Sequence, residues 1–132
     1  MTAPTTTRTL SPILLIEDEP SVSAFVRAAL ERRGYKVVQA SSGAEGLQQL
    51  KAGIYGGVIS DIRMPGKLNG ADVHKWIQEN RPELGARIIL ISGDTANSET
   101  QTLLSKTDTP CIEKPFRVQQ LILTVEKTFG KP

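Results

Sequence analysis

The chain has 132 residues, a formal net charge of +2 and 23% charged residues, values typical of one globular domain with a single core. It has no dense run of basic residues, so the sequence does not indicate a nucleic-acid surface. The early apolar run at 13–16 is too short for a signal peptide or a membrane span. The single cysteine, Cys111, excludes an internal disulfide and is typical of a reducing compartment. We therefore expect a cytoplasmic protein that does not attach to a membrane by itself.

Alternating apolar runs and helical patterns follow an N-terminal segment, 1–12, whose Thr- and Pro-rich composition predicts a flexible tail. In chain order, the predicted elements are a strand at 13–16, a helix from Pro20 to Gly34, a strand at 36–40, a helix ending at Gly53, a strand at 57–60, a helix ending near Asn80, a strand at 87–92, a weak helix within 96–106, a strand at 110–114 and a helix from Val118. Most of the runs are continuously apolar, which is typical of parallel strands covered on both faces. Five such βα units predict a doubly wound α/β sandwich at 13–130.

The predicted helices each carry an apolar stripe at helical spacing. The stripes comprise Val22, Phe25, Val26, Ala29 and Leu30; Ala44, Leu47 and Leu50; Val73, Trp76 and Ile77; Leu103 and Leu104; and Val118, Leu121, Ile122 and Val125. Pro20 suits the first turn of its helix, and Gly34 suits a left-handed residue after the helix end. We expect Trp76 in the core and His74, the only histidine, as a solvated helix residue.

Polar side chains stand at the carboxyl ends of four of the five predicted strands. Glu17, Asp18 and Glu19 follow the first strand, Asp61 the third, Ser92 ends the fourth, and Lys114 ends the fifth. In doubly wound sheets, ligands bind beyond this edge, where the strand order reverses. If the strands take the order 2-1-3-4-5, the first and third are neighbours, so Glu17, Asp18 and Asp61 converge and Lys114 approaches from the other side.

Three carboxylates in one pocket repel one another unless a cation lies between them. Carboxylate, carbonyl and water oxygens favour Mg²⁺ in such a place. Together with a lysine and a hydroxyl, these groups are what a phosphoryl acceptor needs, because cations neutralise the phosphoryl oxygens while a carboxylate attacks phosphorus. Two local alternatives remain: Asp61 could simply begin the loop before Pro65, and we expect Glu19 only to complement a helix dipole.

The motifs "LLIEDEP", "SDIRMPG", "ISGD" and "IEKPF" resemble those of the response-regulator receiver domains of two-component signalling. The resemblance runs from about Ile13 to Phe129 and implies a flavodoxin-like (βα)5 fold, a sheet order of 2-1-3-4-5 and Mg²⁺ as cofactor. By this resemblance, Asp61 is the phosphoacceptor, Ser92 is the switch hydroxyl and Lys114 contacts the phosphoryl group. The resemblance also implies that Asp18 is a direct metal ligand, that Glu17 is a companion acid acting through water, and that Arg63 binds the metal through its backbone carbonyl. It also implies a cis peptide bond before Pro115 and, as phosphodonor, a phosphohistidine on a sensor histidine kinase or a histidine phosphotransfer domain.

The chain departs from the usual receiver pattern in two places. The loop "MPGKLNG" is one residue longer than usual and, with "SGD" and "EKPF", is most similar to receivers of hybrid histidine kinases. Cys111 stands where the family usually has the Tyr or Phe of its activation switch. We therefore expect phosphorylation to rearrange mainly the loop after Ser92 and the weak fourth helix. At the rim, Arg63 and Asp94 are expected to form an ion pair that partly covers the phosphoryl group. The alternatives are that Arg63 pairs directly with the phosphoryl oxygens or that both residues are simply solvated.

The prediction is a Mg²⁺-dependent phosphoacceptor that relays a signal and is not a metabolic enzyme. We expect no effector domain after Pro132, so the output would pass through contacts with an unknown downstream protein. A stand-alone regulator and the receiver of a hybrid kinase both fit the sequence. Two alternatives of other classes are a receiver-like docking scaffold without phosphorylation and a small Mg²⁺-dependent phosphohydrolase.

Overall fold

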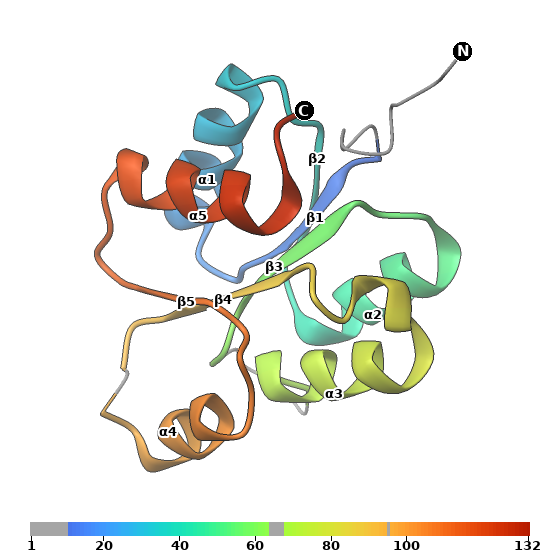
Figure 1. Ribbon diagram of the computed structural model, residues 1–132, viewed down its shortest axis with the longest axis vertical. Coiled ribbons are helices and arrows are strands. Elements are labelled where there is room, and N and C mark those ends of the chain that lie inside the picture. Colours follow the sequence, from blue (N-terminus) through green and yellow to red (C-terminus); the bar gives the residue numbers. More distant parts are fainter. Residues whose placement is uncertain (1–10, 64–67, 95) are drawn as a thin grey trace.

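The computed structural model describes residues 11–63, 68–94 and 96–132 as a three-layered α/β sandwich (Figure 1). The central parallel sheet has the order β2-β1-β3-β4-β5, which confirms the predicted order and fold class. The strands are β1 (Ile13–Ile16), β2 (Val37–Ala40), β3 (Gly57–Asp61), β4 (Ile88–Ser92) and β5 (Cys111–Glu113). The helices are α1 (Pro20–Arg32), α2 (Gly43–Ala52), α3 (Gly70–Asn80), α4 (Ser98–Ser105) and α5 (Val118–Phe129), with a 3₁₀ turn at Pro82–Leu84.

The apolar core lies on both faces of the sheet, which is why the strand sequences are continuously apolar. In β1, Ile13 and Leu15 face α1 and α5, while Leu14 and Ile16 face α2 and α3. All four side chains are fully buried. Because successive side chains of a strand point to opposite faces, a strand covered on both sides has no position for a solvated residue.

Local signals in the sequence define the helix ends. Pro20 is in the first turn of α1, and Gly34 beyond its end has φ 97°, the left-handed conformation predicted for it. At the start of α3, the side chains of Asn69 and Asp72 each accept a hydrogen bond from the backbone N–H of the other. This capping box fixes where the helix begins after the loop that follows Asp61.

The burial of a few side chains differs from the sequence-based expectation. His74 is only 8% exposed because the connection between α4 and β5 covers it, and its Nε2 lies 2.9 Å from Oγ1 of Thr109. The prediction of a solvated histidine was therefore wrong. Phe25 and Val118 are 41% and 42% exposed, and Ala44 is exposed too, because each lies at the edge of its helix's apolar stripe.

Two further predictions concern the helices and the N-terminus. Trp76 is partly buried and packs against the core between the sheet and α3. The predicted tail at 1–12 lies outside the described residues except for its last two positions. Among the helices that the structure describes, none has the length and hydropathy that a membrane crossing needs.

Candidate functional site

Charged side chains from three parts of the chain meet at the carboxyl edge of the sheet. Asp61 is the last residue of β3, Glu17 follows β1 directly, Glu19 precedes α1, and Lys114 follows β5. The strand order explains the meeting, because β1 and β3 are neighbours and residues at the ends of parallel strands share one edge. Of the four residues predicted to converge, the structure brings Glu17, Asp61 and Lys114 together, whereas Asp18 is not part of the carboxylate cluster.

Lys114 is the centre of this cluster. Its Nζ lies 2.7 Å from Asp61 Oδ2, 3.2 Å from Glu17 Oε1 and 3.1 Å from Glu19 Oε1. The side chain of Lys114 is 16% exposed, that of Asp61 6% and that of Glu17 0%. One ammonium thus faces three carboxylates, two of them buried, and cannot neutralise all of them. The cluster keeps an excess of negative charge.

The pKa values of the cluster reflect this imbalance. Burial raises the pKa of the Glu17 carboxyl to about 7, and the charge of Asp61 adds to the rise, while the N–H of Glu19 and the ammonium of Lys114 oppose it. Burial alone would lower the pKa of Lys114. The hydrogen bond to Asp61 and the charge of Asp61, with help from Glu19 and Glu17, hold it above its ordinary value. Lys114 is therefore a permanent cation, and the Glu17 carboxyl takes up a proton near neutral pH.

Backbone groups fix the orientation of two of the carboxylates. The N–H of Glu19 donates to Glu17 Oε2 at 3.0 Å, and the N–H of Arg63 donates to Asp61 Oδ1 at 3.2 Å. Each bond spans two residues and is set by the turn that ends its strand. Each buried carboxylate is thus held by one backbone donor, which leaves its other oxygen directed at Lys114.

Gly70 lets the start of α3 lie against the end of β3. A Cβ at Gly70 would overlap the backbone of Asp61 and Ile62, and the N–H of Gly70 donates to the carbonyl of Ile62 at 2.8 Å. A glycine is needed here for close approach of two backbones rather than for a left-handed conformation. This contact determines how far the helix stands from Asp61.

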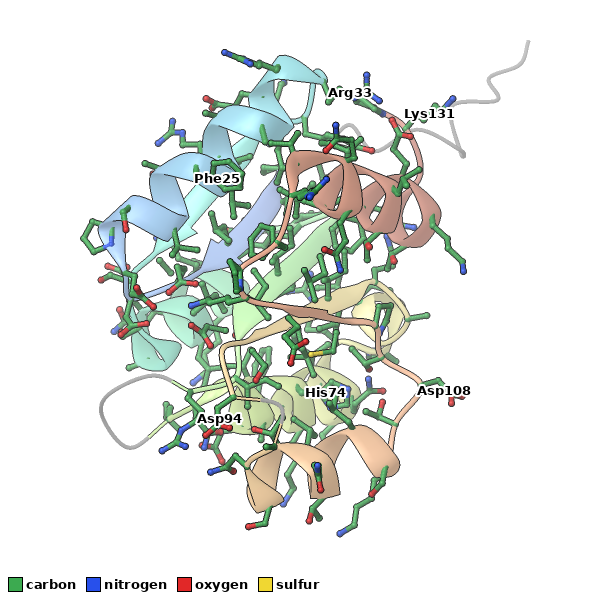
Figure 2. The ribbon with its side chains drawn as sticks, turned by 90° about the vertical axis from the view of Figure 1, so that its left-hand side faces the viewer. Phe25, Arg33, His74, Asp94, Asp108 and Lys131 are labelled. Atoms are coloured by element: carbon green, nitrogen blue, oxygen red, sulfur yellow. The ribbon has the colours of Figure 1, made fainter. Side chains whose placement is uncertain are left out.

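Ser92, Arg63 and Asp94 lie where the sequence predicted them. The Oγ of Ser92, at the buried end of β4, accepts the N–H of Asp94 at 3.1 Å. Arg63 and Asp94 form the expected ion pair, with Nη1 and Oδ2 3.7 Å apart and both side chains more than half exposed. Figure 2 shows Asp94 on the side of the molecule away from Asp108, the loop residue near His74. The peptide bond between Lys114 and Pro115 is cis, as predicted.

Three carboxylates among the described residues offer oxygens within 4.8 Å of one another, namely Glu17, Glu19 and Asp61. One of these oxygens, Glu17 Oε1, is buried, and among the described residues it has the ion pair with Lys114 but no hydrogen bond. Three carboxylates this close together with a single ammonium among them fit a hard divalent cation. Asp18, the predicted direct ligand, is half-buried and is not one of the three.

Glu19 is the residue of this site that the sequence analysis missed. It was assigned only to the helix dipole, yet its carboxylate joins the cluster and pairs with Lys114. The spacing of Glu19 from Glu17 in the sequence could have indicated its place in the site, because side chains two residues apart in extended backbone point to the same side. Glu19 has extended backbone angles, φ −90° and ψ 114°.

Cys111 lies at the start of β5, half-buried against the core on the side of α3. Burial raises the pKa of its thiol, and the charges of Glu113 and Asp61 raise it further. A neutral thiol of this kind is a small apolar side chain with little nucleophilic character. It supplies no chemistry to the site.

Comparisons with known proteins agree on one family. The family model of the response regulator receiver domain matches residues 13–126. The sensor kinase CckA of Brucella abortus is 31% identical over 121 residues, which are 90% of this chain and 12% of CckA. The response regulator receiver protein CpdR of the same organism is 30% identical over 87% of this chain and 93% of its own length.

Solved structures give the same fold. The response regulator protein TrrA of Thermotoga maritima, in complex with Mg²⁺-BeF, is 29% identical and superposes with a TM-score of 0.76 over 90% of this chain and 99% of that one. A CheY-like receiver domain protein of Methanospirillum hungatei has a TM-score of 0.81 at 22% identity, over 91% of this chain and 94% of that one.

Proposed function

The chain belongs to the response regulator receiver domain family, and we propose that it accepts a phosphoryl group on Asp61 from a phosphohistidine. The donor would be a sensor histidine kinase or a histidine phosphotransfer domain. The observation that carries the proposal is the contact of 2.7 Å between Asp61 Oδ2 and the ammonium of Lys114, inside a cluster of carboxylates at the end of β3. This is a nucleophile with a fixed cation beside it.

The reaction transfers one phosphoryl group in each of two steps. A carboxylate oxygen of Asp61 attacks phosphorus while the P–N bond of the phosphohistidine breaks, and the imidazole nitrogen keeps the electron pair and takes up a proton. Later, water attacks phosphorus and the bond to the Asp61 oxygen breaks, which releases inorganic phosphate and restores the carboxylate. The only turnover expected is this cycle of self-phosphorylation and self-dephosphorylation, as in a signalling protein rather than a metabolic enzyme.

Lys114 and Ser92 would contact the transferred group. The ammonium of Lys114 is oriented by Asp61 before transfer and would neutralise phosphoryl oxygens afterwards. The hydroxyl of Ser92 now accepts an N–H from Asp94 and can donate its own proton to a phosphoryl oxygen. Ser92 stands on β4, the strand next to β3, and Lys114, which follows β5 on the far side of β4, already contacts Asp61, so little reorganisation is needed.

Glu17, Asp18 and Asp61, with the backbone carbonyl of Arg63, would hold Mg²⁺, and Glu19 is added to this set by its place in the cluster. Bound Mg²⁺ supplies positive charge that neutralises the phosphoryl oxygens during transfer. Binding there would also replace Lys114 as the counter-ion of Glu17, so that the ammonium is available to the phosphoryl group. The complex of TrrA with Mg²⁺-BeF supports the same ligand for this chain.

The phosphorylated state would act through contacts with a downstream protein, in the cytoplasm, which the single cysteine supports. Relatives occur in two arrangements. The chain spans nearly all of CpdR but only 12% of the kinase CckA, so both a stand-alone regulator and a domain of a larger kinase are represented among them.

The test is phosphorylation by acetyl phosphate with Mg²⁺, followed by mass spectrometry of the intact protein and mapping of the labile site. Wild type should gain one acid-labile phosphoryl group on Asp61, and Asp61→Asn should gain none, because an amide is not a nucleophile. Asp108→Asn, at an exposed aspartate remote from the site, is the matched control and should behave as wild type. Uptake by Asp61→Asn at the wild-type rate would refute the assignment. Absence of uptake by wild type would favour the docking scaffold, and steady turnover of p-nitrophenyl phosphate would favour the phosphohydrolase.

A further inference from the structure

A groove lies between α1 and α5, and none of the residues of the carboxylate cluster lines it. It encloses about 670 Å³ and is lined by Phe25, Ala28, Ala29, Arg32, Arg33, Val118, Gln119, Ile122 and Leu123. Figure 2 shows Phe25 on α1, and Arg33 and Lys131 at one end of the same layer. On α1, the groove extends from Phe25 to Arg32, a length of about 10 Å at the rise of an α-helix.

The groove gathers most of the large apolar side chains that the protein exposes. Among the described residues, four large hydrophobic side chains are exposed: Phe25, Ile54, Val118 and Leu123, at 41%, 76%, 42% and 67%. Three of them line the groove, whereas Ile54 lies elsewhere. Single exposed hydrophobic residues are common, but a group of them in one concave place is typical of an interaction site.

The layer around the groove is more basic than the rest of the chain. Residues 20–33 and 117–132 carry six Lys or Arg and two Glu, a net charge of +4, although the whole chain has only +2. Both glutamates already have partners, since Glu31 pairs with Arg27 and Glu126 with Arg33. In the described part of the chain, the remaining basic side chains of this layer form no ion pair; they are Arg32, Arg117, Lys127 and Lys131.

We propose that the groove between α1 and α5 binds an amphipathic helix of a partner protein, with an apolar stripe for Phe25 and Leu123 and acidic residues that face Arg32. A helix of two to three turns matches the length of the groove, and side chains at i, i+3, i+4 and i+7 would enter it. Acidic flanks would complement the uncompensated positive charge and would direct both encounter and specificity. Binding there needs no phosphoryl transfer.

Two other occupants fit the same surface less well. A second copy of this chain, packed through the same patch, would bring two faces of net charge +4 together, and like charges disfavour that contact. An anionic membrane would match the charge, but a membrane surface cannot fill a hollow, whereas protruding side chains of a helix can.

The test uses two designed helical peptides of about 18 residues, long enough for measurable helicity in water. Both carry the same leucine stripe, flanked by Glu in one peptide and by Lys in its twin. Fluorescence anisotropy should show that wild type binds the Glu peptide at least about tenfold more tightly than the twin, because like charges repel across the interface. Chemical shifts of backbone amides should move mainly in α1 and α5.

The variants separate the apolar and the ionic contributions. Leu123→Ser should weaken binding of the Glu peptide by roughly tenfold, as expected for a central apolar anchor. Arg32→Glu should weaken binding of the Glu peptide and strengthen binding of the Lys twin. Ile54→Ser, at the exposed hydrophobic residue outside the groove, is the matched control and should leave both affinities unchanged.

Several outcomes would overturn the proposal. The proposal is wrong if neither peptide binds, if the Glu peptide and its Lys twin bind equally tightly, or if Ile54→Ser weakens binding as much as Leu123→Ser does. A dimer in light scattering that Leu123→Ser dissociates would assign the groove to a second copy. Flotation with anionic vesicles in place of peptide binding would assign it to a membrane. Phosphorylation of Asp61 by acetyl phosphate should proceed at the wild-type rate in Leu123→Ser and Arg32→Glu, so failure of the groove can be told from failure of the phosphoacceptor function.

Discussion

Replacement of Lys114 by Met should destabilise the fold at neutral and alkaline pH, because it removes the one cation from a cluster of three carboxylates. Loss of one partner from a fully buried ion pair costs roughly 3–5 kcal/mol. Lys114 is 16% exposed, and its partner Glu19 is 57% exposed, so solvent screens part of the interaction. We expect a loss of about 2–3 kcal/mol in the free energy of unfolding.

The assay is urea unfolding in EDTA, followed by circular dichroism. With a slope of roughly 2 kcal/mol per molar urea, typical for small proteins, the midpoint should fall by about 1–1.5 M at pH 8. The pKa of the Glu17 carboxyl, already raised to about 7, should rise further once the ammonium is gone. A carboxyl whose pKa is raised by folding contributes stability at low pH that is lost as the pH rises through its folded value. The difference between variant and wild type should therefore shrink at pH 5.

Addition of Mg²⁺ at pH 8 should restore more stability to Lys114→Met than it adds to wild type, because the metal cation would replace the missing ammonium. The matched control is Lys75→Met, at an exposed lysine of α3, which should change the midpoint little. Equal midpoints for wild type and Lys114→Met at pH 8 in EDTA would show that the ion pairs of the cluster contribute no net stability. A deficit that is the same at pH 5 and pH 8 would refute the electrostatic cause.

Three other predictions concern the surroundings of the site. Burial lowers the pKa of His74 below 6.5, so protonation of its ring should reduce the free energy of unfolding as the pH falls below about 6.5. His74 is the only histidine, and its ring protons therefore give a single NMR titration. A titration midpoint at or above 6.5 would contradict its burial. Gly70→Ala should lower the free energy of unfolding by about 1–3 kcal/mol in a thermal or urea melt, because its Cβ meets the backbone of Asp61; wild-type stability would show that α3 can shift without cost. Arg63→Ala and Asp94→Ala should each speed the decay of phosphorylated Asp61 without changing stability by more than about 1 kcal/mol, since the exposed pair would obstruct the attacking water. If the double variant shows the sum of the two single effects, the pair does not act as a unit.

The fold and the position of Asp61 could be predicted from the sequence because both depend on local patterns. Continuous apolar runs define strands that are covered on both faces, and Pro20 and Gly34 mark the limits of α1. Once five βα units are recognised, the carboxyl ends of the strands must share an edge, and Asp61 and Lys114 follow from that. The ion pair of Arg63 and Asp94 was predictable for the same reason, since each lies just beyond a neighbouring strand.

Only the tertiary structure decided the roles of Glu19, His74 and Phe25. Glu19 pairs with Lys114, 95 residues away along the chain, and a local acidic run does not reveal such a partner. His74 is buried because the connection from α4 to β5 packs over it, and Phe25 is exposed because α5 leaves a groove beside α1. A residue's own neighbours in the sequence fix its backbone conformation and the side of the helix or strand on which it lies. Its burial, its counter-ion and its pKa depend on segments that only folding brings against it.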